Sequence, residues 1–195
     1  SSAAVLFVAA GVLAYAQAPA SEFARIAAEG LKQSGAPGMS IAIVTDDRIA
    51  WAEGFGLADV ENDVPARANT VYRIASISKP IAATAVMQLV ERGRVSLDDP
   101  IQKYVVAFPA KGEQKVTVRH LMTHTSGIRH YRDGEMESRD RYQTVADALR
   151  IFKDDPLLFA PGTKYSYSTY AYNLLAGVVE TASGLTFEEY LKLAR

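Results

Sequence analysis

The pattern of apolar and polar residues divides the chain after residue 21 into a helix, a strand pair and a block of helices. Apolar residues at helical spacing predict a helix over 23–33, and the Gly-Ala-Pro-Gly run at 35–38 ends it. Residues 39–44 and 49–55 are strand-like, and the Asp-Asp-Arg turn between them predicts a hairpin in a mostly buried sheet. No third strand pattern follows, so we expect an α+β fold in which one hairpin represents the sheet.

The helical block starts at about residue 74. The predicted helices span 76–92, 118–123, 144–153, 170–182 and 186 onward. Gly93 and Gly184 are placed to end two of them, because glycine readily adopts the left-handed conformation that often follows a helix. Capping boxes are expected at Thr144-Asp147 and Thr186-Glu189. The last helix has no stop signal before Arg195, so we expect the chain to be truncated at its C-terminus.

The first 20 residues have the character of a secretory signal peptide. Residues 1–21 carry no charge, and residues 3–16 form an apolar run that is too short to span a bilayer comfortably. Small residues such as Ala16 and Ala20 provide cleavage sites. We predict a signal peptide over 1–20 and a periplasmic or secreted protein. A buried N-terminal helix and an uncleaved membrane anchor are the alternatives.

Composition narrows the classes of function. The 195 residues are 49% hydrophobic and 22% charged, which is typical of a globular domain and excludes a disordered chain. The net charge of -1 provides no basic field for phosphates, so nucleic acid is not an expected partner. The absence of cysteine excludes disulfides, thiolate-bound metals and a cysteine nucleophile.

Ser76 and Lys79 form the first candidate catalytic pair. They lie three residues apart where an apolar helix begins, so they share one face and the lysine can take the serine proton. If Ser76 is the N-cap, unpaired N–H groups and the positive end of the helix dipole lie beside its hydroxyl and can stabilise an oxyanion. In a chain of this composition with its residues in random order, roughly half of one Ser-x-x-Lys match is expected by chance. An ordinary helix cap beside a solvated lysine is therefore the alternative.

Further motifs surround this pair in a specific order and spacing. They are 72–79 (YRIASISK), 97–101 (LDDPI), 121–128 (LMTHTSGI), 161–163 (PGT) and 167–169 (YST). Through them, residues 38–195 resemble the serine β-lactamase-like family, which includes class C β-lactamases, D-alanyl-D-alanine carboxypeptidases and related esterases. The resemblance implies a β-lactamase/transpeptidase-like fold, with a helical block beside an antiparallel sheet.

Three segments are most similar to one branch of that family. They are 58–62 (ADVEN), 126–131 (SGIRHY) and 167–169. The branch is that of the mitochondrial serine β-lactamase-like proteins, which is associated with peptidase activity and self-assembly. Self-assembly therefore joins the open possibilities for this chain.

The resemblance implies a serine hydrolase that works through an acyl-enzyme. Ser76 is the implied nucleophile, Lys79 its proton acceptor and Tyr167 the hydroxyl that carries a proton to the leaving group; whether Lys79 or Tyr167 is the general base stays open. Thr169 lies at the substrate-binding position where the family usually has asparagine, and a hydroxyl lacks the paired donor and acceptor of an amide. An ester or small peptide is the expected substrate. A β-lactamase, a carboxypeptidase, and a non-catalytic penicillin-recognising or scaffold protein are the alternatives.

One motif of the family is missing. A Lys or His followed by Thr or Ser and then Gly does not occur after Tyr167. In the family, the strand that carries this motif helps to form the oxyanion hole and extends the sheet. We therefore expect residues 21–195 to be the N-terminal part of the domain, and the isolated chain to be feebly active or unstable.

Competing sites are weaker. His120 and His124 have the spacing of two zinc ligands on a helix, but Leu121 stands where a zincin has its glutamate, and no third ligand is evident. We expect no metal and no cofactor, and His124 is expected to hydrogen-bond a turn near the site. The charged segment 129–141 predicts a solvated loop. The expected partners are small ester, peptide or β-lactam substrates, with no stable membrane insertion after removal of the signal peptide.

Overall fold

The computed structural model describes residues 20–113 and 115–193. The predicted signal peptide lies outside these residues, apart from Ala20, where the first described helix begins. None of the helices in the described ranges is both long enough and apolar enough to cross a membrane. The chain divides into two compact units, and the boundary along the sequence lies between Arg73 and Ile74.

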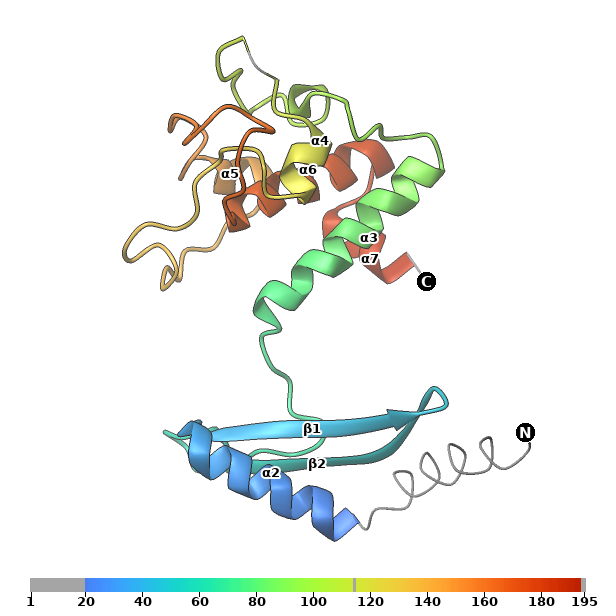
Figure 1. The fold of residues 1–195 in the computed structure, drawn as a ribbon, viewed down its shortest axis with the longest axis vertical. Coiled ribbons are helices and arrows are strands. Elements are labelled where there is room, and N and C mark those ends of the chain that lie inside the picture. The colour runs from blue at the N-terminus through green and yellow to red at the C-terminus, as the bar shows by residue number, and fades with distance from the viewer. Residues whose placement is uncertain (1–19, 114, 194–195) are drawn as a thin grey trace, which may run out of the picture. The chain divides into compact units, whose positions relative to one another are not determined.

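The first unit is a helix against an antiparallel sheet. Helix α2 (Ala20–Ser34) lies along the strands β1 (Gly38–Thr45) and β2 (Arg48–Asp59), as Figure 1 shows. The Phe23 ring of α2 packs 5.9 Å from the Trp51 ring of β2, centroid to centroid. Asp46 and Asp47, both at positive φ, connect the strands in a two-residue turn. The predicted hairpin is confirmed, but the prediction of a mostly buried sheet was wrong, because every residue of β1 and β2 is exposed or only partly buried.

A third strand, β3 (Val64–Pro65), extends the sheet in the order β1-β2-β3. It pairs Leu57 with Pro65 and Asp59 with Val64. The expectation of a hairpin alone was wrong, because two residues are too few to show an alternating pattern and proline argues against a strand. The chain after β3 approaches so closely that a Cβ on Gly54 would lie 2.3 Å from the backbone nitrogen of Arg67.

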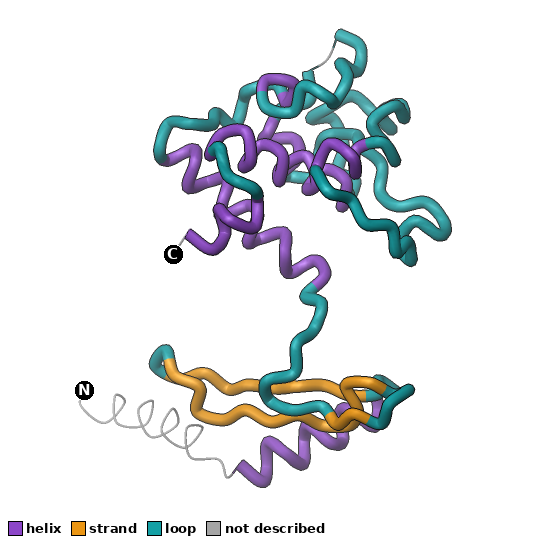
Figure 2. Tube along the Cα trace, turned by 180° about the vertical axis from the view of Figure 1, so that it is seen from behind, coloured by secondary structure: helices purple, strands orange, loops and turns teal. Residues whose placement is uncertain are grey.

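The second unit is helical. Its helices are α3 (Ser78–Glu91), α4 (Val118–Met122), α5 (Val145–Leu149), α6 (Thr169–Ser183) and α7 (Phe187–Leu193). Long loops join α3 to α4, α4 to α5 and α5 to α6, and a short one joins α6 to α7 (Figure 2). Gly93 and Gly184 follow α3 and α6 at positive φ, as predicted. The predicted capping boxes at Thr144-Asp147 and Thr186-Glu189 also form. Helix α5 ends earlier than predicted, because the chain turns after Leu149.

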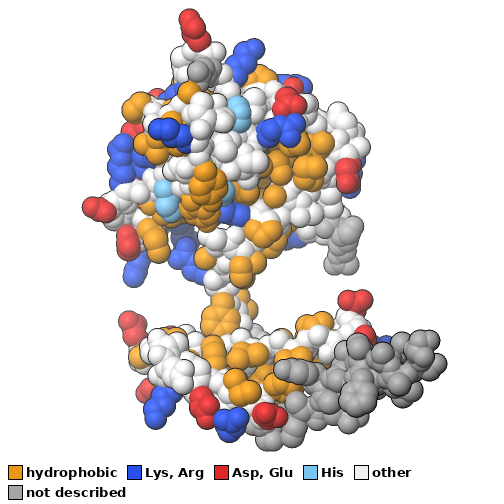
Figure 3. Space-filling view, viewed as in Figure 1, with side chains coloured by type: hydrophobic (Ala, Val, Ile, Leu, Met, Phe, Trp, Pro, Cys, Tyr) orange, Lys and Arg blue, Asp and Glu red, His pale blue; other side chains and the backbone are white. Residues whose placement is uncertain are grey.

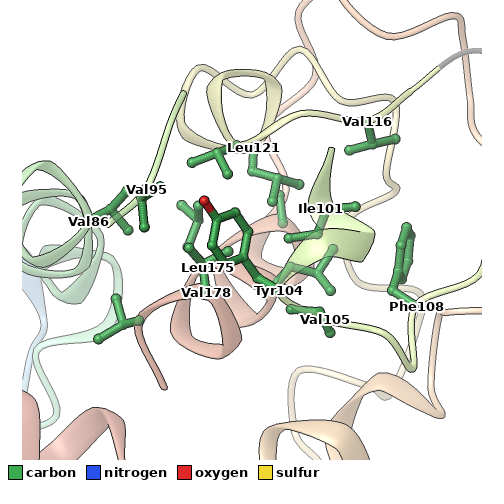
Figure 4. Packing of buried hydrophobic residues seen from close by; sticks show 14 of the residues in the cluster. Val86, Val95, Ile101, Tyr104, Val105, Phe108, Val116, Leu121, Leu175 and Val178 are labelled. Carbon is green, nitrogen blue, oxygen red and sulfur yellow. The ribbon is translucent and has the colours of Figure 1, made fainter. Parts of the chain in front are cut away.

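Helix α6 runs through the hydrophobic core of this unit. Leu175 and Val178 of α6 are fully buried, together with Val86 of α3 and Leu121 of α4 (Figure 4). Gly177 lets the helix approach the loop after the 3₁₀ turn Ile101–Lys103, since a Cβ there would lie 2.9 Å from Val105 Cγ2. Because α3 and α6 pack on the same core, residues at their N-termini are held in a fixed relation.

Part of the charged segment 129–141 is buried rather than solvated. The Arg129 side chain is only 8% exposed, and its guanidinium donates to both carboxylate oxygens of Glu135 and, at 2.6 Å, to Asp155 Oδ2. Tyr170 of α6 donates to Glu135 Oε2 at 2.8 Å. The solvated-loop prediction was wrong here, because a cation is buried where distant carboxylates neutralise it.

Candidate active site

Ser76 lies in the 3₁₀ turn Ala75–Ile77, directly before α3, and its side chain is exposed. The sequence placed Ser76 at the cap of the helix, whereas α3 begins at Ser78 with Ile77 as its N-cap. This start makes Pro80 the third residue of the helix. The first N–H groups of a helix have no partner within it, so the missing N–H of proline costs nothing at this position.

The backbone around Ser76 is only partly available to a substrate. The Ile77 N–H donates to the Ile74 carbonyl at 3.0 Å, and the Ser78 N–H donates to the Ala75 carbonyl. The expectation of free donors is therefore wrong for these two groups. Ala75 has φ of 45°, a left-handed conformation that is unusual for a residue other than glycine and costs about 1–2 kcal/mol. The chain before the candidate nucleophile is therefore strained.

Lys79 lies one helical turn after Ser76 and is half-buried. Its Nζ donates to Ser76 Oγ at 3.3 Å and to Thr169 Oγ1 at 3.2 Å. It also lies 4.8 Å from the centre of the Tyr167 ring and 5.7 Å from that of Tyr172. Lys79 thus places positive charge between the serine and the start of α6.

Tyr167 approaches Ser76 from the other side, with 2.6 Å between its hydroxyl oxygen and Ser76 Oγ. Burial raises the pKa of Tyr167, but hydrogen bonding with Lys79 and Ser76 outweighs this effect, so the pKa lies below the ordinary tyrosine value. The structure therefore brings together all four predicted site residues, Ser76, Lys79, Tyr167 and Thr169. Their roles in catalysis remain predictions.

Two histidines flank Tyr167. The His124 ring lies 4.5 Å from the Tyr167 ring and the His130 ring 5.3 Å, centroid to centroid. His124 Nδ1 accepts the Ser168 N–H at 3.1 Å, so His124 bonds the backbone near the site as predicted, but at the N-cap of α6 and not at a turn. His130 Nδ1 accepts the Thr169 N–H at 3.3 Å, a contact that the sequence did not indicate.

On the face drawn in Figure 3, histidine side chains lie among hydrophobic and basic ones on the helical unit. Burial is the main cause that lowers the pKa of both His124 and His130, and the charge of Lys79 adds to it. Both rings are therefore neutral at pH 7. His124 has φ of 56°, so its backbone is also strained.

His120 has a structural role outside this site. Its Nδ1 accepts the Thr117 N–H at 3.3 Å, and Thr117 Oγ1 accepts the His120 N–H, which together cap the start of α4. Across residues 20–113 and 115–193, no three His, Cys, Asp or Glu side chains lie close enough together to hold a metal ion. The pair His120 and His124 therefore finds no third ligand among these residues.

Comparison with known proteins identifies the family of this chain. The profile of the Beta-lactamase family matches residues 23–193. The chain belongs to the Beta-lactamase family. The resemblance to serine β-lactamase-like proteins and the predicted α+β fold are thereby confirmed.

Members of the Beta-lactamase family with similar sequences include a human protein and a bacterial esterase. "Serine beta-lactamase-like protein LACTB, mitochondrial" of Homo sapiens is 34% identical in an alignment 226 positions long, gaps included, which covers 81% of this chain and 41% of that protein. "Esterase EstB" of Burkholderia gladioli is 34% identical in an alignment 171 positions long, gaps included, which covers 80% of this chain and 43% of the esterase. The chain thus spans about two fifths of the length of these relatives.

A solved structure agrees with this membership. The octameric penicillin-binding protein homologue from Pyrococcus abyssi superposes with a TM-score of 0.74 at 33% identity. The match covers 90% of this chain and 42% of the homologue. The match in fold therefore extends over most of this chain but less than half of the homologue.

Proposed function

We propose that the protein is a serine hydrolase that cleaves an ester or a small peptide through an acyl-enzyme on Ser76. The observation that carries the proposal is the exposed Ser76 hydroxyl, which lies 2.6 Å from the Tyr167 hydroxyl and 3.3 Å from Lys79 Nζ. A serine is a weak nucleophile until a neighbouring base takes its proton. Both candidate bases lie within hydrogen-bond reach of Ser76 Oγ.

Tyr167 is the proposed general base. Lys79 Nζ donates hydrogen bonds to Ser76 and Thr169, whereas hydrogen bonding with Lys79 and Ser76 outweighs burial and lowers the pKa of Tyr167. In the first step the Tyr167 phenolate takes the Ser76 proton while Oγ bonds to the substrate carbonyl carbon. Tyr167 then passes this proton to the leaving alkoxide or amine as its bond to that carbon breaks.

Water completes the proposed cycle. It attacks the carbonyl carbon of the acyl-enzyme while Tyr167 takes one of its protons. The bond to Ser76 Oγ then breaks, and Tyr167 returns the proton to Oγ. Lys79 stabilises the phenolate form of Tyr167 at each stage, because its positive charge lies beside the ring.

Thr169 supports an ester rather than a substrate with a carboxamide side chain. Its hydroxyl oxygen already accepts from Lys79, so one donor and one acceptor lone pair remain on a single atom, which cannot pair with both polar atoms of a carboxamide. An amide at this position would offer both a donor pair and an acceptor. The similarity to Esterase EstB also supports an ester, while the penicillin-binding protein homologue supports recognition of a β-lactam as the second candidate.

The test uses the natural protein at full length, with a fluorophosphonate probe and a p-nitrophenyl ester. Ser76→Ala is expected to abolish labelling and to lower kcat at least about 1,000-fold, whereas the neighbouring Ser78→Ala keeps both. Tyr167→Phe is expected to lower kcat about 100-fold or more, and Tyr165→Phe, at a side chain that is 69% exposed, serves as its control.

Other outcomes identify the alternatives. Turnover of a chromogenic cephalosporin in preference to the ester indicates a β-lactamase. A folded protein that neither takes the label nor turns over any of these substrates is a scaffold or binding protein, and the proposal is then wrong.

We further propose that the protein is exported and that it self-assembles. The uncharged apolar run over 3–16 supports export, and the octameric homologue supports assembly. Fractionation of cells that express the natural gene, followed by light scattering of the purified protein, tests both. Retention in the cytoplasm contradicts export, and a monomer contradicts assembly.

A further inference from the structure

Helix α6 begins with two backbone N–H groups that donate to imidazoles. The first N–H groups of a helix have no partner within it, and oxygen-bearing side chains usually accept their hydrogen bonds. At this helix Ser168 Oγ accepts only the Ala171 N–H, at 3.1 Å. The N–H groups of Ser168 and Thr169 instead donate to Nδ1 of His124 and His130.

These contacts determine the protonation state of both rings. A ring nitrogen that accepts a hydrogen bond carries no proton, so His124 and His130 are neutral with their proton on Nε2. Protonation converts Nδ1 into a donor that faces another donor. The hydrogen bond is then lost, and two like-oriented N–H dipoles repel each other.

The surroundings add to the cost of protonation. The titratable groups that face His124 come from α3, from the loop before α6, from α6 itself and from the second histidine; they are Lys79, Tyr165, Tyr167, Tyr172 and His130. Those that face His130 are Lys79, Tyr131, Tyr167 and His124. No ion pair among the described residues includes either histidine. The charged neighbour of both rings is thus the cation Lys79.

The hydrogen-bonded residues are those that define the site. Ser168 directly follows Tyr167, and Thr169 accepts the hydrogen bond of Lys79. The His124 ring packs against the Tyr167 ring at a 34° tilt and the His130 ring meets it edge-on at 87°. A shift of either imidazole therefore moves the Tyr167 hydroxyl relative to Ser76.

We infer that His124 and His130 are positioning residues that hold Tyr167 and Thr169 in their working geometry only while both rings are neutral. A proton on either ring disorders the start of α6, and this sets a lower pH limit for activity. The activity readout of this inference rests on the proposed hydrolase function. The protonation state of the rings does not, so the two can fail separately.

Asparagine variants test the inference through the pH profile. Asparagine places an oxygen acceptor near the position of Nδ1 and does not titrate, and it tolerates the positive φ of residue 124. Each proton that inactivates the free enzyme adds one to the limiting acid slope of log kcat/KM against pH. His124→Asn and His130→Asn are each expected to lower this slope by one. Their kcat/KM at pH 8 is expected to fall as well, because asparagine lacks the ring that packs against Tyr167.

His120→Asn is the matched control. Its Nδ1 also accepts a backbone N–H, from Thr117, but this hydrogen bond caps α4 and not α6. The slope is expected to stay unchanged in this variant. His130→Leu, which removes the acceptor, is expected to lower kcat about tenfold at pH 8, because one hydrogen bond of about 1.4 kcal/mol is lost. An unchanged slope in both His124→Asn and His130→Asn overturns the inference.

A second readout needs no catalysis. In ¹⁵N–¹H correlation spectra of the natural protein, the signals of these three histidines are assigned as the imidazole signals that each of the three asparagine variants loses. We expect Nδ1 of His124 and His130 to be unprotonated at pH 7. A proton on either Nδ1 overturns the inference even if Ser76 labels. Conversely, unprotonated Nδ1 atoms in a protein that does not label uphold the positioning and contradict the hydrolase.

Discussion

Replacement of Glu135 by glutamine removes the charge that holds Arg129 while keeping the shape of the side chain. Glu135 accepts two hydrogen bonds from the guanidinium, at 2.7 and 3.0 Å, and one from the Tyr170 hydroxyl at 2.8 Å. Its side chain is 23% exposed, so solvent screens the pair only in part. Arg129 is the first cause that lowers the pKa of Glu135, from 4.5 to about 2.

The lowered pKa of Glu135 gives the magnitude of its contribution to the free energy of unfolding. One pKa unit corresponds to about 1.4 kcal/mol, so the ionised carboxylate contributes about 3 kcal/mol to the folded state at pH 7. The pKa is lower in the folded state than in the unfolded state, so the contribution is complete above pH 4.5 and is lost as pH falls through about 2. At pH 3 about 1.4 kcal/mol of it remains.

Urea unfolding of the natural protein, followed by circular dichroism at pH 7, 5 and 3, measures this contribution. Glu135→Gln is expected to lower the free energy of unfolding by about 3 kcal/mol at pH 7 and by about half as much at pH 3. Glu137→Gln is the control, because Glu137 is exposed and forms no hydrogen bond with the described residues. A loss below about 0.5 kcal/mol at pH 7, or one that does not shrink at pH 3, refutes the reasoning.

Three further substitutions test the packing. Leu175→Ala is expected to lower the free energy of unfolding by about 3 kcal/mol, because it leaves a cavity in a fully buried position; urea unfolding checks this, and a loss under 1 kcal/mol contradicts it. Gly54→Ala is expected to destabilise residues 20–73 by about 3 kcal/mol, because its Cβ meets backbone atoms; unchanged resistance to limited proteolysis there contradicts this. Ser168→Ala is expected to cost about 1–2 kcal/mol and to lower kcat, because the Ala171 N–H loses its acceptor; wild-type kinetics and stability contradict both.

The features that could be predicted from the sequence depend on neighbouring residues. The helix stops at Gly93 and Gly184 and the capping pair Thr144-Asp147 follow from local backbone chemistry, and the structure confirms them. The approach of Ser76 and Lys79 follows from helical spacing. Tyr167, which lies 91 positions from Ser76, was identified only through resemblance to a family, because no local pattern shows a contact at that separation.

The features that were missed depend on distant partners. Arg129 is buried because Asp155, 26 positions later, helps to neutralise it, and a segment of mixed charge gives no sign of that pairing. The cap that His130 provides for Thr169 joins positions 39 apart. Strand β3 was missed because its two residues are too few to show an alternation of apolar and polar positions. For Arg129 and His130 the deciding interaction joins distant positions, whereas the pattern that was analysed is local.

Residues 129 and 130 are neighbours in sequence and connect the ion-pair cluster of Arg129, Glu135 and Asp155 to the candidate site. The titratable groups of the cluster and of the site respond to pH in adjoining ranges. The Arg129 carbonyl accepts from Ser168 Oγ at 2.8 Å, and the next residue, His130, accepts from the Thr169 N–H. Burial first, and then Lys79, holds the pKa values of His130 and His124 below 6.5 in the folded state.

As pH falls below 6.5, the unfolded state therefore binds protons at these two histidines before the folded state does, and the folded state loses stability. Glu135 adds its own loss only below 4.5. The double variant His124→Asn with His130→Asn is expected to flatten the decline in unfolding free energy between pH 6.5 and 4.5, while Glu135→Gln leaves that decline in place. If the double variant declines as steeply as wild type in this range, the protonation cost lies elsewhere in the protein.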